Sequence, residues 1–372
     1  MKEIIWKPEL HRFSSCKEFV EEFRLGASDL ILTNEYIYQP YFGAMNLECA
    51  VLYQEQYGMG EPTDVMAEAI LRDAAATGCS RVVAIGGGTV IDIAKVLAVG
   101  GGESIDELYG MAPELPKRRE LVLIPTTCGT GSEVTNISIM ARTRIGTKLG
   151  LVSPAMYADY AVLIPQLLEG LPFKVFAASS IDALVHATES FLSPHRKTMT
   201  SELFSEKAMD VILKGFKLID EKGQDARFEY MDQFVTASFY AGIAFLKAGC
   251  GPVHGMSFPL GGTYHVPHGE SNYMLFGAIM DYYDEHKPDG EIMKFKELVS
   301  SILGCEVKDA IPEMNALLQR ILPLRPLRDC GFTEADFKAF PLSVEANQQR
   351  LMTNAYYPFD LESEEAIYRK CY

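Results

Sequence analysis

Residues 251 to 270, GPVHGMSFPLGGTYHVPHGE, contain three of the seven histidines of the chain. Farther back, SSIDALVHATES places Asp182 and His186 four residues apart in a helical pattern, so both side chains project from one face. Such a pair alone is more often a surface contact than a set of ligands. Together with His254 and His268 it makes three imidazoles and one carboxylate, a set that suits a first-row divalent metal. A metal of this kind would lower the pKa of an alcohol and aim its carbon at a nicotinamide.

A second kind of chemistry is indicated by AIGGGTVIDIAK at residues 84 to 95, which we expect to form a strand, a tight turn and the start of a helix. The turn consists of Gly86, Gly87 and Gly88. Glycines let the backbone approach a ligand, and the free amides of a helix N-terminus bind anions such as a pyrophosphate. We interpret Thr89 and Asp92 as the N-cap of the helix and its capping carboxylate. The stretch lacks the G-x-G-x-x-G spacing, so a turn that binds nothing is the alternative.

The segment PTTCGTGSE at residues 125 to 133 also follows an expected strand. Its glycines and hydroxyl side chains, including those of Thr126 and Thr127, offer hydrogen bonds to a bound nucleotide. Two polar loops at the ends of strands in one sheet favour a nucleotide site over two empty turns. Cys128 in this loop and Cys250 near the histidines are interpreted as lining groups and not as nucleophiles.

Composition limits the class of protein. A chain of 372 residues is long enough for two cores, and its 48% hydrophobic and 23% charged residues are typical of a soluble globular protein. No stretch approaches the roughly 20 apolar residues of a membrane span, and the charged start MKEIIWKPELHRF is unlike a signal peptide, so we expect a cytoplasmic protein without a membrane partner. A net charge of -16 would repel nucleic acid, which is not expected as a partner. Eight cysteines without a C-x-x-C pair predict reduced thiols.

Strand and helix patterns predict two domains. In the first half, β-rich runs alternate with helical stretches at 63–78 and 89–100, which indicates a parallel sheet with helices on its faces. The expected strands are 28–35, 48–53, 81–88, 121–127 and the runs NISIMA, KLGLVS and YAVLIP. From about Pro172 the apolar spacing is helical. We therefore expect a Rossmann-like α/β dinucleotide-binding domain over 1–172 and a helical metal-binding, catalytic domain over 173–372.

These motifs together resemble the iron-containing, group III alcohol dehydrogenases. The likeness lies in GGGTVIDIAK, IPTTCGTGSEVT, SSIDALVHATESF, the spacing from His254 to His268 and the terminal MTNAYYPFDLESEEAIY. It covers nearly the whole chain and implies a cleft between the two domains as the active site, with a homodimer as the assembly. Within the family the chain is most similar to enzymes that interconvert 4-hydroxybutyrate and succinate semialdehyde. The implied activity is reversible hydride transfer between a nicotinamide cofactor and a short-chain hydroxy acid.

The resemblance also assigns roles by matching motifs. The implied ligands of Fe2+, or alternatively of Zn2+, are Asp182, His186, His254 and His268. The implied contacts of the pyrophosphate are Gly86, Gly87, Gly88 and Thr89. Thr126 and Thr127 would flank the nicotinamide half of NAD, Lys148 would reach a cofactor ribose, and Asp92 would order the glycine turn.

Two departures from the family bear on the substrate side. Phe258 stands where the family often has a histidine assigned to proton relay or substrate contact. His265 is the available substitute, and a histidine of a surface loop is the alternative interpretation. Lys247 stands where the family more often has Asn, seven residues before His254. A hydroxy acid needs a cation for its carboxylate, so we expect Lys247 to bind it; a surface lysine is the alternative.

A third departure bears on the cofactor. Asn34 ends the run LILTN, where the family commonly has an Asp that repels the 2′-phosphate of NADP. The neutral amide removes that charge. Glu35 follows, however, and no Lys or Arg lies nearby in the sequence to pair with a phosphate, so NAD is favoured over NADP.

Other functions remain open from the sequence. Within the same class, the chain could be a general primary-alcohol or diol dehydrogenase, or a hydroxyacid-oxoacid transhydrogenase. The dehydroquinate synthases share the glycine turn, but they need a cluster of basic residues for a sugar phosphate, and residues 240 to 270 contain only Lys247. A metal store or partner-binding module would not need two nucleotide loops.

Overall fold

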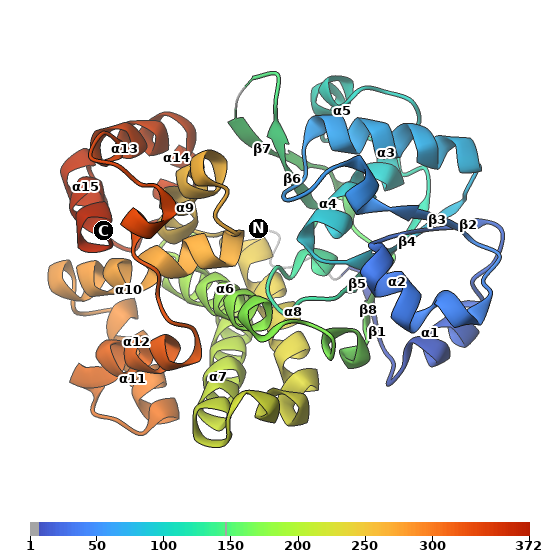
Figure 1. Cartoon of the computed structure of the whole chain (residues 1–372). Helices are drawn as coiled ribbons and strands as arrows, with labels where there is room; N and C mark the ends of the chain where they lie inside the picture. The colour runs from blue at the N-terminus through green and yellow to red at the C-terminus, as the bar shows by residue number, and fades with distance from the viewer. Residues whose placement is uncertain (1–6, 146) are drawn as a thin grey trace. The chain divides into compact units, whose positions relative to one another are not determined.

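The computed structural model describes residues 7–145 and 147–372, which form two compact units, one ending at Leu171 and one starting at Pro172 (Figure 1). The first unit is built on a six-stranded sheet in the order β1-β8-β5-β4-β2-β3, and every neighbouring pair in it is parallel. The strands are β1 (Glu9–Arg12), β2 (Asp29–Thr33), β3 (Ala50–Tyr53), β4 (Arg81–Gly86), β5 (Glu120–Pro125) and β8 (Tyr160–Leu163). The predicted α/β fold with a parallel sheet is confirmed, although β1 was not expected.

The central strands are buried on both faces, as an apolar run in a parallel sheet requires. One set of alternate residues, including Leu30 and Val82, packs in a core with the apolar faces of α3 and α4. The intervening residues, such as Ile31 and Val83, are fully buried as well. The helices of this unit are α1 (Cys16–Phe23), α2 (Glu35–Tyr41), α3 (Asp64–Thr77), α4 (Gly88–Val99) and α5 (Ile105–Met111).

The strand order places a topological switch between β2 and β4. The chain passes from β2 outward to the edge strand β3, then returns to β4 on the other side of β2 and continues through β5 to β8. Loops that leave adjacent strands in opposite directions open a crevice at the carboxyl ends of those strands, where ligands of such sheets bind. The segments after Thr33 and Gly86 therefore border the site that the fold offers to a nucleotide.

Two expected strands lie outside this sheet. β6 (Ile137–Arg142) and β7 (Thr147–Val152) form a separate antiparallel hairpin. The expectation of parallel pairing is wrong for this pair, because only a short turn joins the two strands and a parallel connection needs a longer crossover.

The second unit is helical throughout (Figure 1). Its helices are α6 (Phe173–Leu192), α7 (Met199–Lys222), α8 (Met231–Ala248), α9 (Pro252–Tyr264), α10 (His268–His286), α11 (Glu291–Leu303), α12 (Ala310–Ile321), α13 (Asp336–Asn347), α14 (Gln349–Met352) and α15 (Leu361–Lys370). Helices α6, α7 and α8 pack on one another. Nearly all of the last three turns of α6 is buried, including its polar residues, so this helix forms the centre of the unit.

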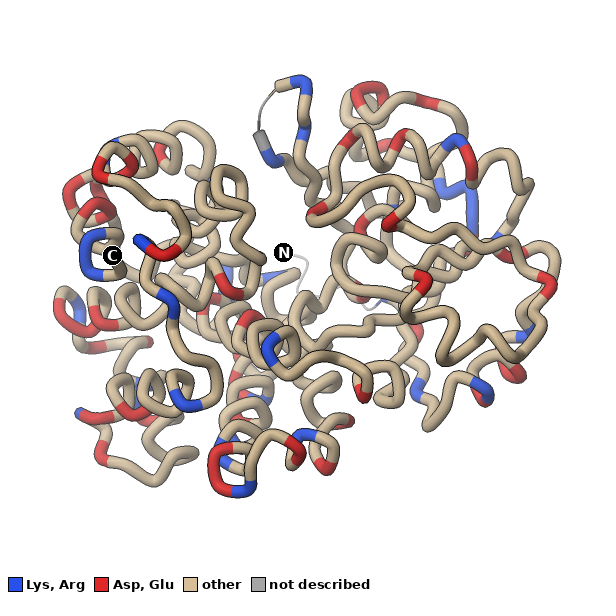
Figure 2. Tube along the Cα trace, in the orientation of Figure 1, with Lys and Arg blue, Asp and Glu red and all other residues tan. Residues whose placement is uncertain are grey.

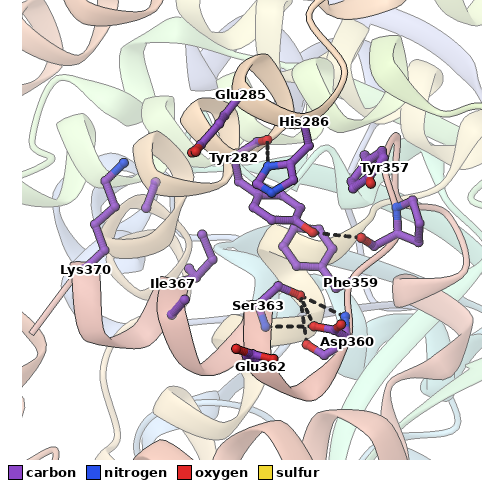
Figure 3. Close-up of a pocket in the computed structure, with 13 residues that line it drawn as sticks. Tyr282, Glu285, His286, Tyr357, Phe359, Asp360, Glu362, Ser363, Ile367 and Lys370 are labelled. Carbon is purple, nitrogen blue, oxygen red and sulfur yellow. Dashed lines mark hydrogen bonds between the residues drawn. The ribbon is translucent and has the colours of Figure 1, made fainter.

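The terminal motif MTNAYYPFDLESEEAIY folds against the carboxyl end of α10 (Figure 3). The hydroxyl of Tyr282 donates to the carbonyl oxygen of Pro358 at 3.0 Å, and the rings of Tyr282 and Phe359 stack with centroids 4.4 Å apart. Asp360 and Ser363 form the capping box that begins α15. A cavity of about 680 Å³ opens beside these residues. The motif thus fixes the position of the last helix.

Acidic residues are spread along both units (Figure 2), in keeping with the net charge of -16. Among the described residues, no single helix has the length and apolar composition to cross a membrane. Two consecutive helical segments, residues 224–248 and 252–264, meet these criteria when taken together, and the chain bends by 106° between them.

Candidate functional site

Three helices of the second unit bring the predicted metal ligands together. Asp182 and His186 lie one turn apart on α6, His254 lies in the first turn of α9, and His268 is the first residue of α10. One ligand atom from each of the four lies within 4.8 Å of the others. The convergence predicted from two distant sequence segments is present in the fold.

A glycine permits this approach. A Cβ atom on Gly269 would lie 2.5 Å from the carbonyl oxygen of Ala178 and 3.2 Å from the Cβ of Asp182. Any larger residue would therefore push the start of α10 away from α6. The sequence His268-Gly269 combines a ligand with the small residue that lets it reach Asp182.

The cluster is closely spaced and largely shielded from water. The Nε2 atoms of His254 and His268 lie 3.9 and 3.8 Å from Oδ1 of Asp182, and the Nε2 atoms of His186 and His254 are 2.9 Å apart. Asp182, His186 and His254 are buried, whereas the side chain of His268 is 34% exposed. The cluster therefore has one partly open side.

Electrostatics favour an ionised carboxylate at the centre. Burial opposes the charge on Asp182, but the imidazoles of His186, His268 and His254 more than offset this effect, and its pKa is lowered. The amide of Asn272 lowers it further by donating to Oδ1 at 2.7 Å. An acceptor-only carboxylate beside three imidazole nitrogens is a donor set for a divalent cation.

Glu189, which the sequence analysis missed, fixes the orientation of one ligand. Its carboxylate accepts from the backbone N–H groups of Gly251 at 2.8 Å and Val253 at 2.6 Å, and it lies 2.6 Å from Nδ1 of His254. A proton on Nδ1 leaves the lone pair on Nε2, the nitrogen that faces Asp182. The available signal was its position on α6, one turn after His186 in the same motif.

Asn272, also missed, lies at the centre of the cluster. Its Nδ2 is 2.7 Å from Oδ1 of Asp182, 3.1 Å from Nε2 of His254 and 3.3 Å from Nε2 of His268. Ser257 donates to its Oδ1 at 2.5 Å and so sets the direction of the amide. An NH2 group has only two hydrogens for these three acceptors, so the cluster retains lone pairs that a cation would take. The spacing of four residues from His268 was the signal in the sequence.

The residues predicted for substrate binding and proton transfer lie close to His254 in the sequence. Phe258 lies one turn after His254 on α9, and its ring centroid is 6.1 Å from that of His268. His265 ends α9 in the left-handed conformation (φ 54°) and is exposed. Among the described residues, no hydrogen bond joins it to the four ligand candidates. Lys247 is half-buried in the last turn of α8, and Phe245 of that turn stacks on His186 at 4.6 Å.

The thiol of Cys250 is close to this cluster. Together with Glu189 and His254 it forms a second group whose ligand atoms lie within 4.8 Å of one another. Burial, and then the charge of Glu189, raises the pKa of Cys250 well above its usual value. A thiol that stays protonated is a poor nucleophile and a poor ligand, which agrees with its interpretation as a lining group.

In the first unit, the two predicted nucleotide loops are neighbours. Gly86 pairs with Pro125 in the parallel register, and the amide of Thr126 donates to the carbonyl oxygen of Gly86 at 3.1 Å. A Cβ on Gly87 would be 3.6 Å from Cγ2 of Thr127. Thr126 is buried and Thr127 is partly exposed, so Thr127 is the more accessible residue of the two.

The predicted cap of α4 is wrong. Gly87, and not Thr89, is the N-cap, and the hydroxyl of Thr89 donates to the carbonyl oxygen of Gly60 at 3.0 Å. Asp92 does not order the glycine turn: it accepts from the hydroxyl of Ser132 at 2.6 Å and from the amide of Ile139 at 2.9 Å. The helix begins at Gly88 because glycine fits the close turn, which places Asp92 one turn farther into the helix, beside the second loop.

A buried lysine supports the same second loop. Lys95 is fully buried, and its ammonium donates to the hydroxyl of Thr135 at 2.8 Å, to the carbonyl oxygen of Ile137 at 2.8 Å and to Ser132 at 2.5 Å. These contacts anchor the segment after PTTCGTGSE to α4. A well-anchored loop presents its amides and hydroxyls in fixed directions.

The two remaining cofactor candidates have partners of their own. Lys148, on β7, forms an ion pair with Glu61. Asn34 is buried, precedes α2, and donates from Nδ2 to Oε1 of Gln54 at 3.2 Å and to Oε2 of Glu55 at 2.8 Å. Contacts of either residue with a ribose stay predictions.

Comparison with known proteins gives matches along nearly the whole chain. Residues 12–165 match the family described as iron-containing alcohol dehydrogenase, and residues 176–372 match the C-terminal part of the Fe-containing alcohol dehydrogenase family. The 4-hydroxybutyrate dehydrogenase of Clostridium kluyveri is 44% identical over 373 residues, covering 100% of both chains. The long-chain-alcohol dehydrogenase 1 of Geobacillus thermodenitrificans is 35% identical over 75% of this chain and 73% of its own.

Solved structures share the fold at lower identity. Sulfoacetaldehyde reductase from Bifidobacterium kashiwanohense, solved in complex with NAD+, superposes with a TM-score of 0.82 at 22% identity over 99% of each chain. A 1,3-propanediol oxidoreductase gives a TM-score of 0.82 at 23% identity over 98% of each chain. At these identities the likeness concerns the fold alone.

Proposed function

Because the chain belongs to the iron-containing alcohol dehydrogenase family, we propose that it is an NAD-dependent enzyme that interconverts 4-hydroxybutyrate and succinate semialdehyde. The observation that carries the proposal is the convergence of one carboxylate and three imidazoles within 4.8 Å. The full-length relative named 4-hydroxybutyrate dehydrogenase supports the choice of substrate.

The four converging side chains would hold the metal ion. They fit a divalent cation because Asp182 is buried among imidazole lone pairs that one amide cannot satisfy. When bound, Fe2+ would act as a Lewis acid that lowers the pKa of the alcohol; Zn2+ accepts the same ligands. Glu189 would keep His254 in the required tautomer, and the open side at His268 would admit the hydroxyl group.

The loops at the carboxyl ends of β4 and β5 would hold NAD, which accepts the hydride at its nicotinamide. The proposed pyrophosphate contacts are Gly86, Gly87, Gly88 and Thr89. The proposed contacts of the nicotinamide half and the riboses are Thr126, Thr127, Lys148 and Asn34. The topological switch between β2 and β4, which borders the first of these loops and Asn34, supports this placement.

Two side chains would handle the rest of the substrate. Lys247 would pair with the carboxylate of the hydroxy acid, and His265, exposed in the turn between α9 and α10, would pass the proton to solvent. Location in the cytoplasm and assembly as a homodimer are further predictions, and sedimentation of the purified enzyme tests the second.

An anaerobic assay of the iron-loaded protein with 4-hydroxybutyrate and NAD tests the proposal. We expect steady NADH production that falls by on the order of 1,000-fold in Asp182→Ala, since Lewis-acid stabilisation is worth several kcal/mol. A zinc-loaded sample decides whether the metals are interchangeable. Greater activity with simple primary alcohols or diols would favour a general alcohol dehydrogenase, and hydride exchange without free NADH would favour a transhydrogenase.

Lys247→Met tests how the substrate is recognised. Loss of a charge-assisted hydrogen bond costs about 1.5–3 kcal/mol, so KM for 4-hydroxybutyrate should rise roughly 10- to 100-fold. The KM for 1-butanol, which has no carboxylate, should stay within about twofold. Equal increases for both substrates would remove Lys247 from carboxylate binding.

A further inference from the structure

Just beyond the ends of strands β2 and β3, an acidic side chain contacts Asn34. Thr33 pairs with Tyr53 in the parallel register, so Asn34 lies abreast of Gln54, and Glu55 follows. The amide of Asn34 donates to Oε2 of Glu55 at 2.8 Å. The backbone N–H group after Asn34, that of Glu35, donates to Oε1 of Glu55 at 2.7 Å. Both carboxylate oxygens of Glu55 are therefore held at the carboxyl end of β2.

The turn after β3 is fixed as well. Gln54 is buried, accepts from Asn34 at 3.2 Å and donates from Nε2 to the carbonyl oxygen of Gly58 at 2.8 Å. These bonds close the short 3-10 helix Gln54–Tyr57, which carries Glu55. The position of the carboxylate is thus set by both its own contacts and those of its neighbour.

The Glu55 carboxylate remains available to a ligand. The residue is partly exposed, and within residues 7–145 and 147–372 no lysine or arginine forms an ion pair with it. Each carboxylate oxygen has two lone pairs, so one donor on each oxygen leaves room for further hydrogen bonds.

In Rossmann-type sheets, an acid at the end of the strand next to the glycine-turn strand accepts hydrogen bonds from the ribose of the adenosine half. Here β2 is the strand next to β4, which carries the glycine turn. Here β2 ends in a neutral amide whose donor is turned toward Glu55. We propose that Glu55, supplied by the turn after the neighbouring strand β3 and positioned by Asn34, takes this role and makes the chain select NAD over NADP. The inference rests on the proposed use of a nicotinamide cofactor.

The physical basis is a conflict of charge. A carboxylate is an acceptor only, so it suits the two hydroxyls of an unmodified ribose. The 2′-phosphate of NADP carries a charge of about -1.5 to -2 at neutral pH and offers more acceptors. Without a cation beside Glu55, the phosphate would meet an unbalanced negative charge. Asn34 then acts as a positioning residue. Glu55, in the turn after β3, supplies the negative charge that an aspartate at position 34 would carry.

Equilibrium binding of NADH and NADPH to the metal-loaded full-length enzyme, followed by nicotinamide fluorescence, tests this assignment. In the wild type we expect NADH to bind at least tenfold more tightly. Glu55→Gln keeps the size of the side chain but removes the charge, and it should reduce this ratio by at least tenfold, mainly through tighter binding of NADPH. Glu55→Arg, which adds a cation for the phosphate, should reverse the preference.

Two further variants locate the effect. Glu48→Gln removes the same charge before the amino end of β3 and should leave the ratio within about twofold. Glu35→Gln removes the exposed acid next to Asn34 and should have a smaller effect than Glu55→Gln; a larger one would overturn the assignment. An unchanged ratio in both Glu55 variants would also overturn it while leaving the proposed dehydrogenase intact. A wild type that binds neither nucleotide would instead contradict the proposed function and this inference together.

Discussion

Two buried glutamates, one in each unit, differ in what surrounds them. Glu133, in the second predicted nucleotide loop, is 1% exposed, and neither of its side-chain oxygens accepts a hydrogen bond from another described residue. Glu189, beside the metal cluster, is 5% exposed and is held by two backbone amides and by His254. A buried carboxylate without donors tends to take up a proton, whereas one with several donors stays in a fixed orientation.

The two units present their functional groups in different ways. The loops of the α/β unit offer backbone amides and small side chains, and the buried Glu133 of the second loop is part of the packing. The helical unit offers ionisable side chains, and Glu189 fixes the orientation of one of them, His254. Substitution of Glu133 should therefore affect stability, and substitution of Glu189 should affect metal affinity.

The largest effect expected from this contrast is a pH dependence of stability. Burial raises the pKa of Glu133 from 4.5 to about 7, with the charge of Lys95 opposing the increase. The folded state then binds more protons than the unfolded state between these values, so stability falls as pH rises through this window, by about 3 kcal/mol in total. Glu133→Gln should remove this dependence. Urea unfolding at pH 5 and pH 8 measures it, and identical pH profiles for both proteins would contradict it.

The next effect concerns the metal. Outer hydrogen-bond partners of metal ligands typically contribute 10- to 100-fold to affinity, so Glu189→Gln should weaken metal binding by roughly that factor. Competition with a chelator measures the affinity independently of activity. Glu202→Gln, which removes an acid of α7 that forms an ion pair with Lys197, serves as the matched control and should bind the metal as the wild type does.

The smallest effect separates two adjacent glycines. A Cβ on Gly86 would lie 2.6 Å from the Cβ of Val90, so Gly86→Ala should lower the free energy of unfolding by about 1 kcal/mol or more. A Cβ on Gly87 would meet only an ordinary contact at 3.6 Å from Thr127. Gly87→Ala should keep its stability and lose NADH affinity, because the methyl group would stand where the pyrophosphate approaches. Equal loss of stability in both variants would contradict a ligand-facing Gly87.

Much of the fold and the metal cluster could be predicted because their signals are local. The helical spacing from Asp182 to His186 places both on one face, and β-rich runs that alternate with helical stretches indicate a parallel sheet. The start of α4 was misjudged because several glycines in a row leave the first helical residue ambiguous, and Thr89 is a common capping residue.

The rest depends on contacts between segments that no local pattern encodes. The meeting of Asn34 with Glu55 follows from the register of β2 and β3, and a shift of one residue would separate them. The bond from Glu189 to His254 depends on how α9 docks on α6. In each case the residue type was visible in the sequence, whereas its partner was set by the tertiary structure.

A crystal structure of the iron-loaded protein, with anomalous scattering recorded at the iron edge, tests directly whether the four converging side chains hold one metal ion. We predict one anomalous peak per chain, roughly 2.0–2.2 Å from a carboxylate oxygen of Asp182 and from one nitrogen each of His186, His254 and His268. A peak elsewhere, or one that lacks any of these four ligands, would contradict the account.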